Sequence, residues 1–232
     1  MSLLSKMFYI EPIKTTSMKK VISILIVLFV GLAIVQPVMA QSKKELQKEV
    51  SKKAMKEARA EAKKLEKQGF KVNPGQPPLA KQVEASWLMG AEEDGKGEKK
   101  YFIADASSVG ESQSAAKLQA YEMAKINLIG QIASEVAGRI KNNVGNQQLS
   151  MEDAASITQT MAEFQSKYSQ KLGRTKTALE IFRIVDKKKV EVRVLLAYNT
   201  DEAMKLAKDL IREELKKVGG MDEQKISKTL QF

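Results

Sequence analysis

The chain has 232 residues, a formal net charge of +11, no cysteine and no histidine. The absence of cysteine excludes a disulfide framework and a cysteine-anchored lipoprotein, so a hydrophobic core must hold the fold together. The absence of both residue types excludes Cys- and His-based catalytic dyads and triads, and it excludes zinc sites built from these ligands.

Residues 18–40 have the pattern of a secretory signal peptide. Lys19 and Lys20 precede an uncharged, apolar run over residues 21–35, and a small-residue end follows at 38–40. The apolar run has 15 residues, which is short of the roughly 20 that a membrane-spanning helix needs. The sequence therefore predicts export rather than a transmembrane anchor, and an uncleaved N-terminal anchor is the alternative.

We expect the signal peptide to be cleaved between Ala40 and Gln41. Residues 1–17 do not fit a signal sequence, so we expect translation to start at Met18 rather than at Met1. The predicted location is the periplasm or the inner face of the outer membrane.

The mature chain would have 192 residues and a formal charge of +8. This length fits one domain with appendages. A basic exported protein suits anionic phospholipid, acidic glycans or acidic partner proteins. Nucleic acid is not an expected partner, because export removes the protein from it and the basic segments have few aromatic residues for base stacking.

Residues 41–72 predict a charged helical arm, whose helix over 42–68 begins with a capping-box pattern at Ser42 and ends at Gly69. Between Lys43 and Gln68 there are nine lysines and one arginine against five glutamates. The narrow apolar stripe is mostly alanine, so we expect the arm to lie outside the core.

This arm has two interpretations, a solvated helix that serves solubility or an interaction arm for an anionic partner. The second interpretation gives six candidate contacts, all lysines: Lys43, Lys44, Lys52, Lys53, Lys63 and Lys64.

Residues 73–78 hold three of the five prolines and predict an extended linker that separates the arm from a domain over 79–217. We expect this domain to fold without the arm. Residues 79–89 fit either a short helix or an alternating strand, and we favour the helix. Residues 218–232 are expected to form a flexible tail.

Within the domain, residues 101–107 predict a strand and residues 111–142 a long helix with alanines in register. A second helix is expected from Ser150, its N-cap, to about Leu172. The last helix follows residue 199 and ends before Gly219.

Residues 177–198 predict a β-hairpin, because apolar residues alternate over 190–198 and the turn falls at 186–188. We expect Phe182 to pair with Val192, which places Arg183 beside Glu191. The fold class is therefore α+β: a small antiparallel sheet of one strand plus a hairpin, packed against long helices, with an N-terminal charged helix.

The alanine-spaced run over residues 114–124, after a strand and before a charged-tip hairpin, resembles two families. These are the LPP-type small outer-membrane lipoproteins and the N-terminal domain of the flagellar ring protein FlgT. The sequence over residues 65–217 is also similar to uncharacterised exported proteins of Bacteroidetes-type bacteria. The resemblance implies fold and envelope location only, and the lipoprotein's anchoring cysteine is absent here.

The function expected from these features is a non-enzymatic exported cell-envelope protein, acting as a structural or protein-binding module. Such a protein would need no cofactor or metal and would associate with a membrane peripherally at most. Its expected partner is an envelope protein or an anionic envelope surface, and the sequence is also compatible with a homo-oligomer. One alternative is a module for a small ligand or glycan, for which the candidate residues are Trp87, Tyr101 and Tyr121. Another is a carboxylate-based hydrolase, with the candidates Asp105, Glu111 and Asp186.

Overall fold

The computed structural model describes residues 36–232 except 96, 146, 148 and 187, with side chains described from residue 52 onward. The chain divides into two compact units, residues 1–50 and 51–232. Of the first unit only the backbone of residues 36–50 is described, and it is helical. The predicted translation start and the signal sequence up to residue 35 lie outside the described residues.

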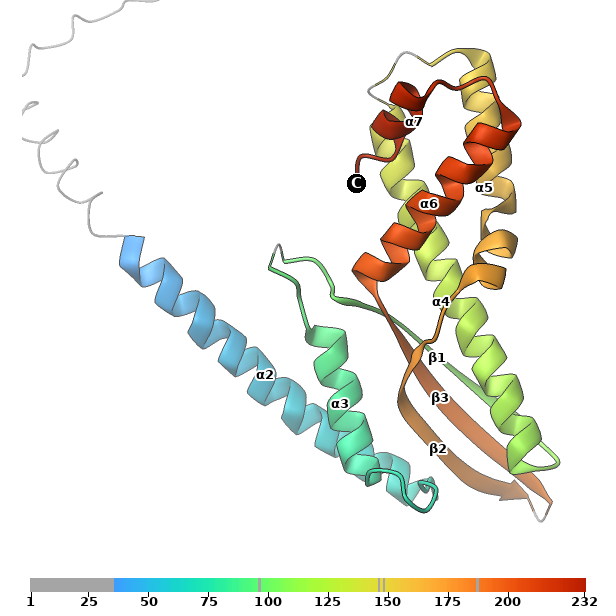
Figure 1. Ribbon diagram of the computed structural model, residues 1–232. Coiled ribbons are helices and arrows are strands. Elements are labelled where there is room, and N and C mark those ends of the chain that lie inside the picture. Colours follow the sequence, from blue (N-terminus) through green and yellow to red (C-terminus); the bar gives the residue numbers. More distant parts are fainter. Residues whose placement is uncertain (1–35, 96, 146, 148, 187) are drawn as a thin grey trace, which may run out of the picture. The chain divides into compact units, whose positions relative to one another are not determined.

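The described elements follow one another as helices and strands in an α+β order, which confirms the predicted fold class (Figure 1). In chain order they are α2 (Gln36–Lys67), α3 (Leu79–Ala91), β1 (Tyr101–Gly110), α4 (Gln113–Val144), α5 (Met151–Lys171), β2 (Lys176–Asp186), β3 (Lys189–Asn199), α6 (Thr200–Val218) and α7 (Glu223–Thr229).

The three strands form one antiparallel sheet in the order β1-β3-β2. The predicted hairpin register is confirmed, since Phe182 pairs with Val192 and Arg183 with Glu191. The Arg183 Nε donates to a carboxylate oxygen of Glu191 at 2.6 Å, so the expected charge pair forms. Alternation of apolar side chains excludes a one-residue slip, which would turn the buried side chains to the other face, and the turn at 186–188 fixes which residues pair.

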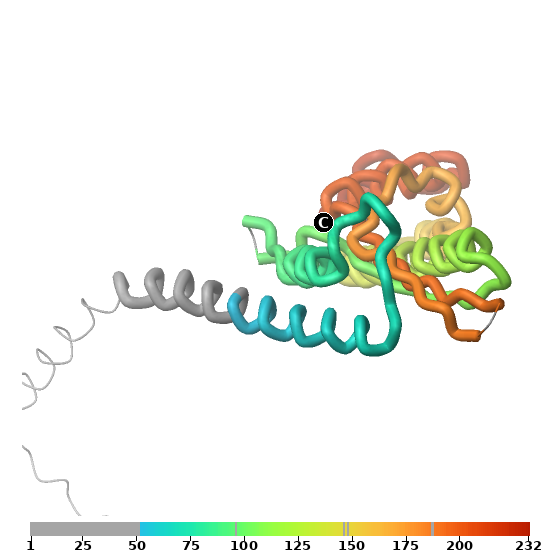
Figure 2. Tube along the Cα trace, turned by 90° about the horizontal axis from the view of Figure 1, so that it is seen from below, coloured from blue at the N-terminus to red at the C-terminus, as the bar shows by residue number. Residues whose placement is uncertain are grey.

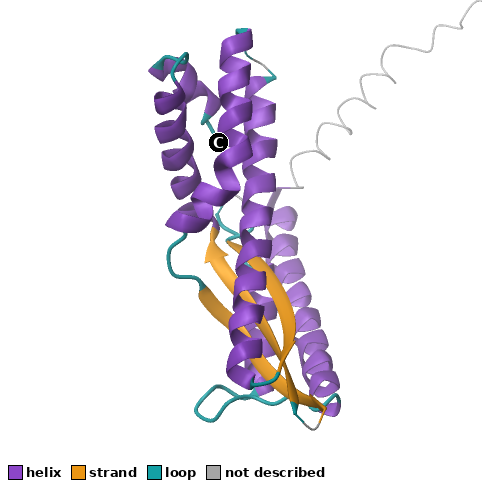
Figure 3. Ribbon diagram, turned by 90° about the vertical axis from the view of Figure 1, so that its right-hand side faces the viewer, coloured by secondary structure: helices purple, strands orange, loops and turns teal. Residues whose placement is uncertain are grey.

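Helix α4 covers one face of the sheet (Figures 2 and 3). Its alanine stripe packs against β1 and β3, in a cluster formed by Ala116, Ala120, Ala124, Ala106, Val192, Val194 and Leu196. Small side chains let the helix approach the sheet closely. At Gly110 a Cβ would lie 2.9 Å from the backbone nitrogen of Ala116, so the chain crosses from β1 to α4 without room for a side chain.

The C-terminal half of α4 packs with α5, α6 and α7 to form the largest apolar cluster. Its fully buried large side chains include Phe164, Tyr168, Leu210 and Ile211. The Tyr168 hydroxyl donates to the backbone oxygen of Ala203 at 3.2 Å, so this buried polar atom has a partner. Helix α5 begins with the expected cap at Ser150, which forms a complete capping box with Asp153.

Residues 79–91 form helix α3, which confirms the helix over the alternative strand. Helix α3 and residues 51–67 of α2 lie on the sheet face opposite α4 (Figure 2). The cluster on this face consists of Ala58, Ala62, Leu65, Phe70, Leu79, Val83, Leu179 and Ile181.

The expectation that the charged helix lies outside the core is wrong for its second half. Ala58, Ala62 and Leu65 are buried, because the alanines let α2 come close enough to cover larger side chains of α3 and β2. The helix ends in a Schellman motif: Phe70 N donates to Leu65 O and Gly69 N to Glu66 O, with Gly69 at φ 86°. The backbone is also already helical at Gln36, the first described residue, so the helix does not start at Ser42.

The predicted linker over 73–78 is not an extended spacer that separates two bodies. The Asn73 side chain donates to Glu180 at 3.1 Å and accepts from Gln113 at 2.6 Å. The Gln82 side chain donates to the backbone oxygen of Pro77 at 2.9 Å. These hydrogen bonds hold the segment against the sheet and α3.

The predicted flexible tail is also wrong for residues 221–230. They contain α7, and the side chains of Met221, Ile226 and Leu230 are buried in the largest apolar cluster. The Asn143 amide on α4 donates to the backbone oxygens of Thr229 and Gln231. The segment is short, but it covers the end of the helical bundle.

Candidate functional site

The candidate site is the basic face of α2, defined here as the exposed side chains of Lys52, Lys53, Lys56, Lys63, Lys64 and Lys67. The predicted contacts Lys52, Lys53, Lys63 and Lys64 all belong to it. For Lys43 and Lys44, as for the expected cleavage site at Ala40 and Gln41, only a helical backbone is described, and their side chains lie outside the described ones.

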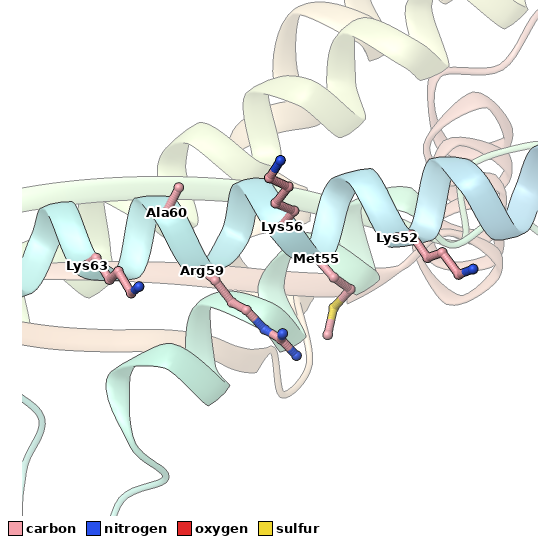
Figure 4. A pocket seen from close by; sticks show the side chains of 6 residues that line it. All are labelled: Lys52, Met55, Lys56, Arg59, Ala60 and Lys63. Carbon is pink, nitrogen blue, oxygen red and sulfur yellow. The ribbon is translucent and has the colours of Figure 1, made fainter.

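The periodicity of the helix produces this face. Residues three and four apart share a side of a helix, so the buried stripe of Ala58, Ala62 and Leu65 directs the lysines to the opposite side. Figure 4 shows Lys52, Lys56 and Lys63 along the helix with Met55, Arg59 and Ala60. The hollow that these six side chains line is formed by α2 alone among the described residues, so it is not an enclosed ligand pocket.

Two other charged residues of α2 form hydrogen bonds with side chains of α3. Arg59 Nε donates to Glu84 at 2.7 Å, and Trp87 Nε1 donates to Glu61 at 2.8 Å. These contacts give one arginine and one glutamate of α2 a partner on α3, although the Arg59 side chain stays exposed. By contrast, the six lysines of the basic face make no ion pair with any residue in the part of the chain that the structure describes.

The three aromatic residues proposed for a ligand do not converge. Trp87 lines an open groove of about 500 Å³ between α2, α3 and the sheet. Tyr101 lines a different hollow, beside Arg139. The Tyr121 hydroxyl is engaged by Thr177 at 2.6 Å and by Glu180 at 3.1 Å.

The three carboxylates considered for a hydrolase are exposed and separate. Asp105 on β1 accepts from Arg193 Nη2 at 3.0 Å. Glu111 follows β1, and Asp186 pairs with Lys189 at the hairpin turn. No pair of them forms the sheltered acid and base that glycoside hydrolysis needs.

The buried carboxylates instead hold elements together. Glu84, Asp153, Glu180 and Glu214 are buried, and each contacts a cation, respectively Arg59, Lys225, Lys117 and Lys167. Hydrogen bonds from Arg59 and then Lys81 lower the pKa of Glu84, and the hydrogen bond from Lys167 lowers the pKa of Glu214. Glu84 and Glu214 therefore stay ionised near neutral pH, which suits structural ion pairs rather than proton donors.

The Asp153–Lys225 pair predicts a pH-dependent stability. The hydrogen bond from Lys225, and then the backbone N–H of Ser150, lower the pKa of Asp153. A carboxyl with a lowered folded-state pKa contributes stability above its unfolded pKa and loses it as pH falls through the folded pKa. We expect the Asp153→Asn variant to have a lower Tm than wild type at about pH 7. The difference in Tm should narrow below about pH 4, which is the ordinary pKa of an aspartate. Thermal melts across this range check it, and a gap of constant size contradicts it.

Among the described residues, no group of three or more acidic side chains is placed to hold a metal ion. No helix in the same part of the chain is long and apolar enough to cross a membrane.

No protein family, curated protein or solved structure matches this chain. The resemblance to lipoprotein and flagellar-ring domains therefore stays a prediction.

Sequence reasoning missed Lys56 and Lys67 as members of the basic face. Both could have been found, because they lie four residues after Lys52 and Lys63 on the same side of a helix. The engagement of Arg59 by Glu84 had no such signal, since these residues are 25 positions apart.

Proposed function

We propose that this chain is a non-enzymatic, exported cell-envelope protein that binds an anionic envelope partner through the basic face of α2. The observation that carries the proposal is the set of six exposed lysines without an acidic partner in the described part of the chain. The buried stripe on the other side of the helix fixes this face outward. The signal-peptide pattern over residues 18–40 supports export.

An anionic phospholipid surface and an acidic envelope protein both fit this charge. The lysines are spread over a convex helix, and such a surface attracts charge without shaping a pocket. Exposed charges act over about 8 Å at physiological salt. The proposed association is therefore peripheral and should weaken as salt rises.

The first measurement is fractionation of cells that express the full chain. We expect the protein to sediment with the envelope at low salt, to be released at high salt, and to begin at Gln41 by mass spectrometry. Retention in high salt contradicts a charge-based association. A released chain that still contains residues 21–35 contradicts the cleavage.

The second measurement compares two variants with the same change in net charge. In one, Lys52, Lys53, Lys63 and Lys64 are replaced by glutamate. In the other, four exposed lysines away from α2 are replaced by glutamate: Lys141, Lys176, Lys205 and Lys228. We expect only the first variant to lose most of its binding to the envelope and to phosphatidylglycerol vesicles. Equal loss in both would mean that net charge, not the basic face, is responsible.

A further inference from the structure

The two edges of the sheet are protected differently. At the β2 edge, Lys71 N donates to Phe182 O at 2.7 Å and Phe182 N to Lys71 O at 2.9 Å, so a segment of chain covers it. The register of β2 is also interrupted at two points. Strand β1 pairs with β3, and no other described strand lies beside its second edge.

Strand β1 lacks the sequence features by which natural proteins prevent edge pairing. Those features include lysines, prolines, bulges and short length. The strand has ten residues, contains no lysine, arginine or proline, and runs beside β3 without a register shift. Its single charge, Asp105, is paired with Arg193 of β3.

The hydrogen-bond pattern between β1 and β3 shows which backbone groups of β1 point to the open edge. Thr200 N donates to Lys100 O at 2.9 Å, in continuation of the β1–β3 pairing. Backbone groups alternate in direction along an antiparallel strand, so the even-numbered residues of β1 bond to β3. The odd-numbered residues, including Ile103, Asp105, Ser107 and Val109, direct their N–H and C=O groups outward. Of these groups the Asp105 C=O already accepts from the Asn127 amide at 3.1 Å, so a pairing strand must share or replace that hydrogen bond.

Exposed apolar side chains flank this edge. Val109 of β1 is 49% exposed. On α4, Gln119 contacts Ser108 and Asn127 donates to Asp105 O, so that side of the helix borders β1. Met123 lies between these two positions on the same side and is 48% exposed.

We propose that the β1 edge pairs with β1 of a second copy of this chain, antiparallel about a two-fold axis, to form a six-stranded sheet. The register centred on Ala106 places Ile103 opposite Val109 of the second copy and Asp105 opposite Ser107. It buries the exposed valine and avoids two facing aspartates. A surface that contacts its own copy about a two-fold axis must be self-complementary, and the strand pairing in this register meets that condition.

The helices on the sheet fit this arrangement. Helix α4 packs on both β1 and β3, through Ala106 and Val194 among others. With strands about 4.8 Å apart, the two copies of α4 would lie on the order of 10 Å apart. This is close to the roughly 8–10 Å of packed helices, with Met123 facing its own copy. The proposal uses β1 and α4, so it is independent of the basic face of α2.

The test uses cysteines, because the chain has none of its own. Opposed residues in a hydrogen-bonded antiparallel pair have Cα atoms about 5.5 Å apart, which suits a disulfide. The variant carrying Ile103→Cys and Val109→Cys, purified from cells that express the full chain, should form a disulfide-linked dimer on mild oxidation. Val109→Cys alone should not, since the two copies of Val109 would lie far apart along the strands.

Equilibrium sedimentation of the cysteine-free protein provides the second readout. We expect a concentration-dependent dimer that Val109→Lys combined with Met123→Lys converts to monomer. The matched control, Leu118→Lys with Ile184→Lys, changes two exposed apolar residues away from this edge and should leave the dimer intact. A monomer at all concentrations overturns the proposal, as does a dimer that survives the first pair of changes. Crosslinking of the single cysteine variant overturns the register.

Discussion

Ala62→Glu is expected to destabilise the protein strongly, although it adds one more charge to a helix that is already highly charged. The Ala62 side chain is 1% exposed and lies in the cluster with Leu65, Val83 and Ile181. An unpaired carboxylate there would be buried or would force α2 off the sheet, and such changes belong to the most destabilising class. We expect a loss of about 3 kcal/mol or more. This corresponds to roughly 6–12 °C in Tm for a chain of this size.

Ala60→Glu is the matched control, because Ala60 is exposed on the same helix two positions away. Its effect should stay within about 0.5 kcal/mol, as for most surface changes. Thermal melts of both variants give the answer. If the two melt alike, residues 51–67 are not part of the core, and a domain that begins at residue 79 would fold alone.

The elements with strong periodicity could be predicted from the sequence. Strict alternation gave the hairpin, the turn position gave its register, and the alanines of α4 indicated close packing on a sheet. In both cases the pattern repeats over several turns or residues, so it outweighs local propensity.

The charged helix and the C-terminal segment were misjudged for a shared reason. Their own apolar surface is small, and composition alone suggested solvent exposure. Burial depends on the neighbours as well: Ala58 and Ala62 are small, yet they cover Leu179 and Ile181 of β2. One local signal was present, since Phe70 directly after Gly69 is the apolar residue that often packs back on a helix end.

The candidate site was accessible from the sequence only in part. Four of its lysines follow from charge density, and the other two follow from helical spacing. Which charged residues α3 would engage could not be deduced, because this depends on contacts between residues 25 or 26 positions apart. The open edge of β1 was equally out of reach, since strand order is not encoded in any single strand.

Ile226→Ala tests whether the C-terminal segment belongs to the core. The Ile226 side chain is 1% exposed, and Met221 and Leu230 lie in the same cluster. Truncating a buried isoleucine to alanine removes apolar contacts and leaves a cavity, which costs about 2–5 kcal/mol. Each kcal/mol lowers Tm by roughly 2–4 °C at this size. A flexible tail would show no change.

Lys228→Ala provides the control for this variant, because Lys228 is exposed on the same helix. Alanine is also the best helix former, so the control should melt like wild type or slightly above it. A large effect of Ile226→Ala beside a silent control would place α7 in the cooperative unit. Equal Tm values of the two variants would mean that residues 221–232 detach before the domain unfolds. Lys225 would then no longer pair with the buried carboxylate of Asp153 when the domain melts.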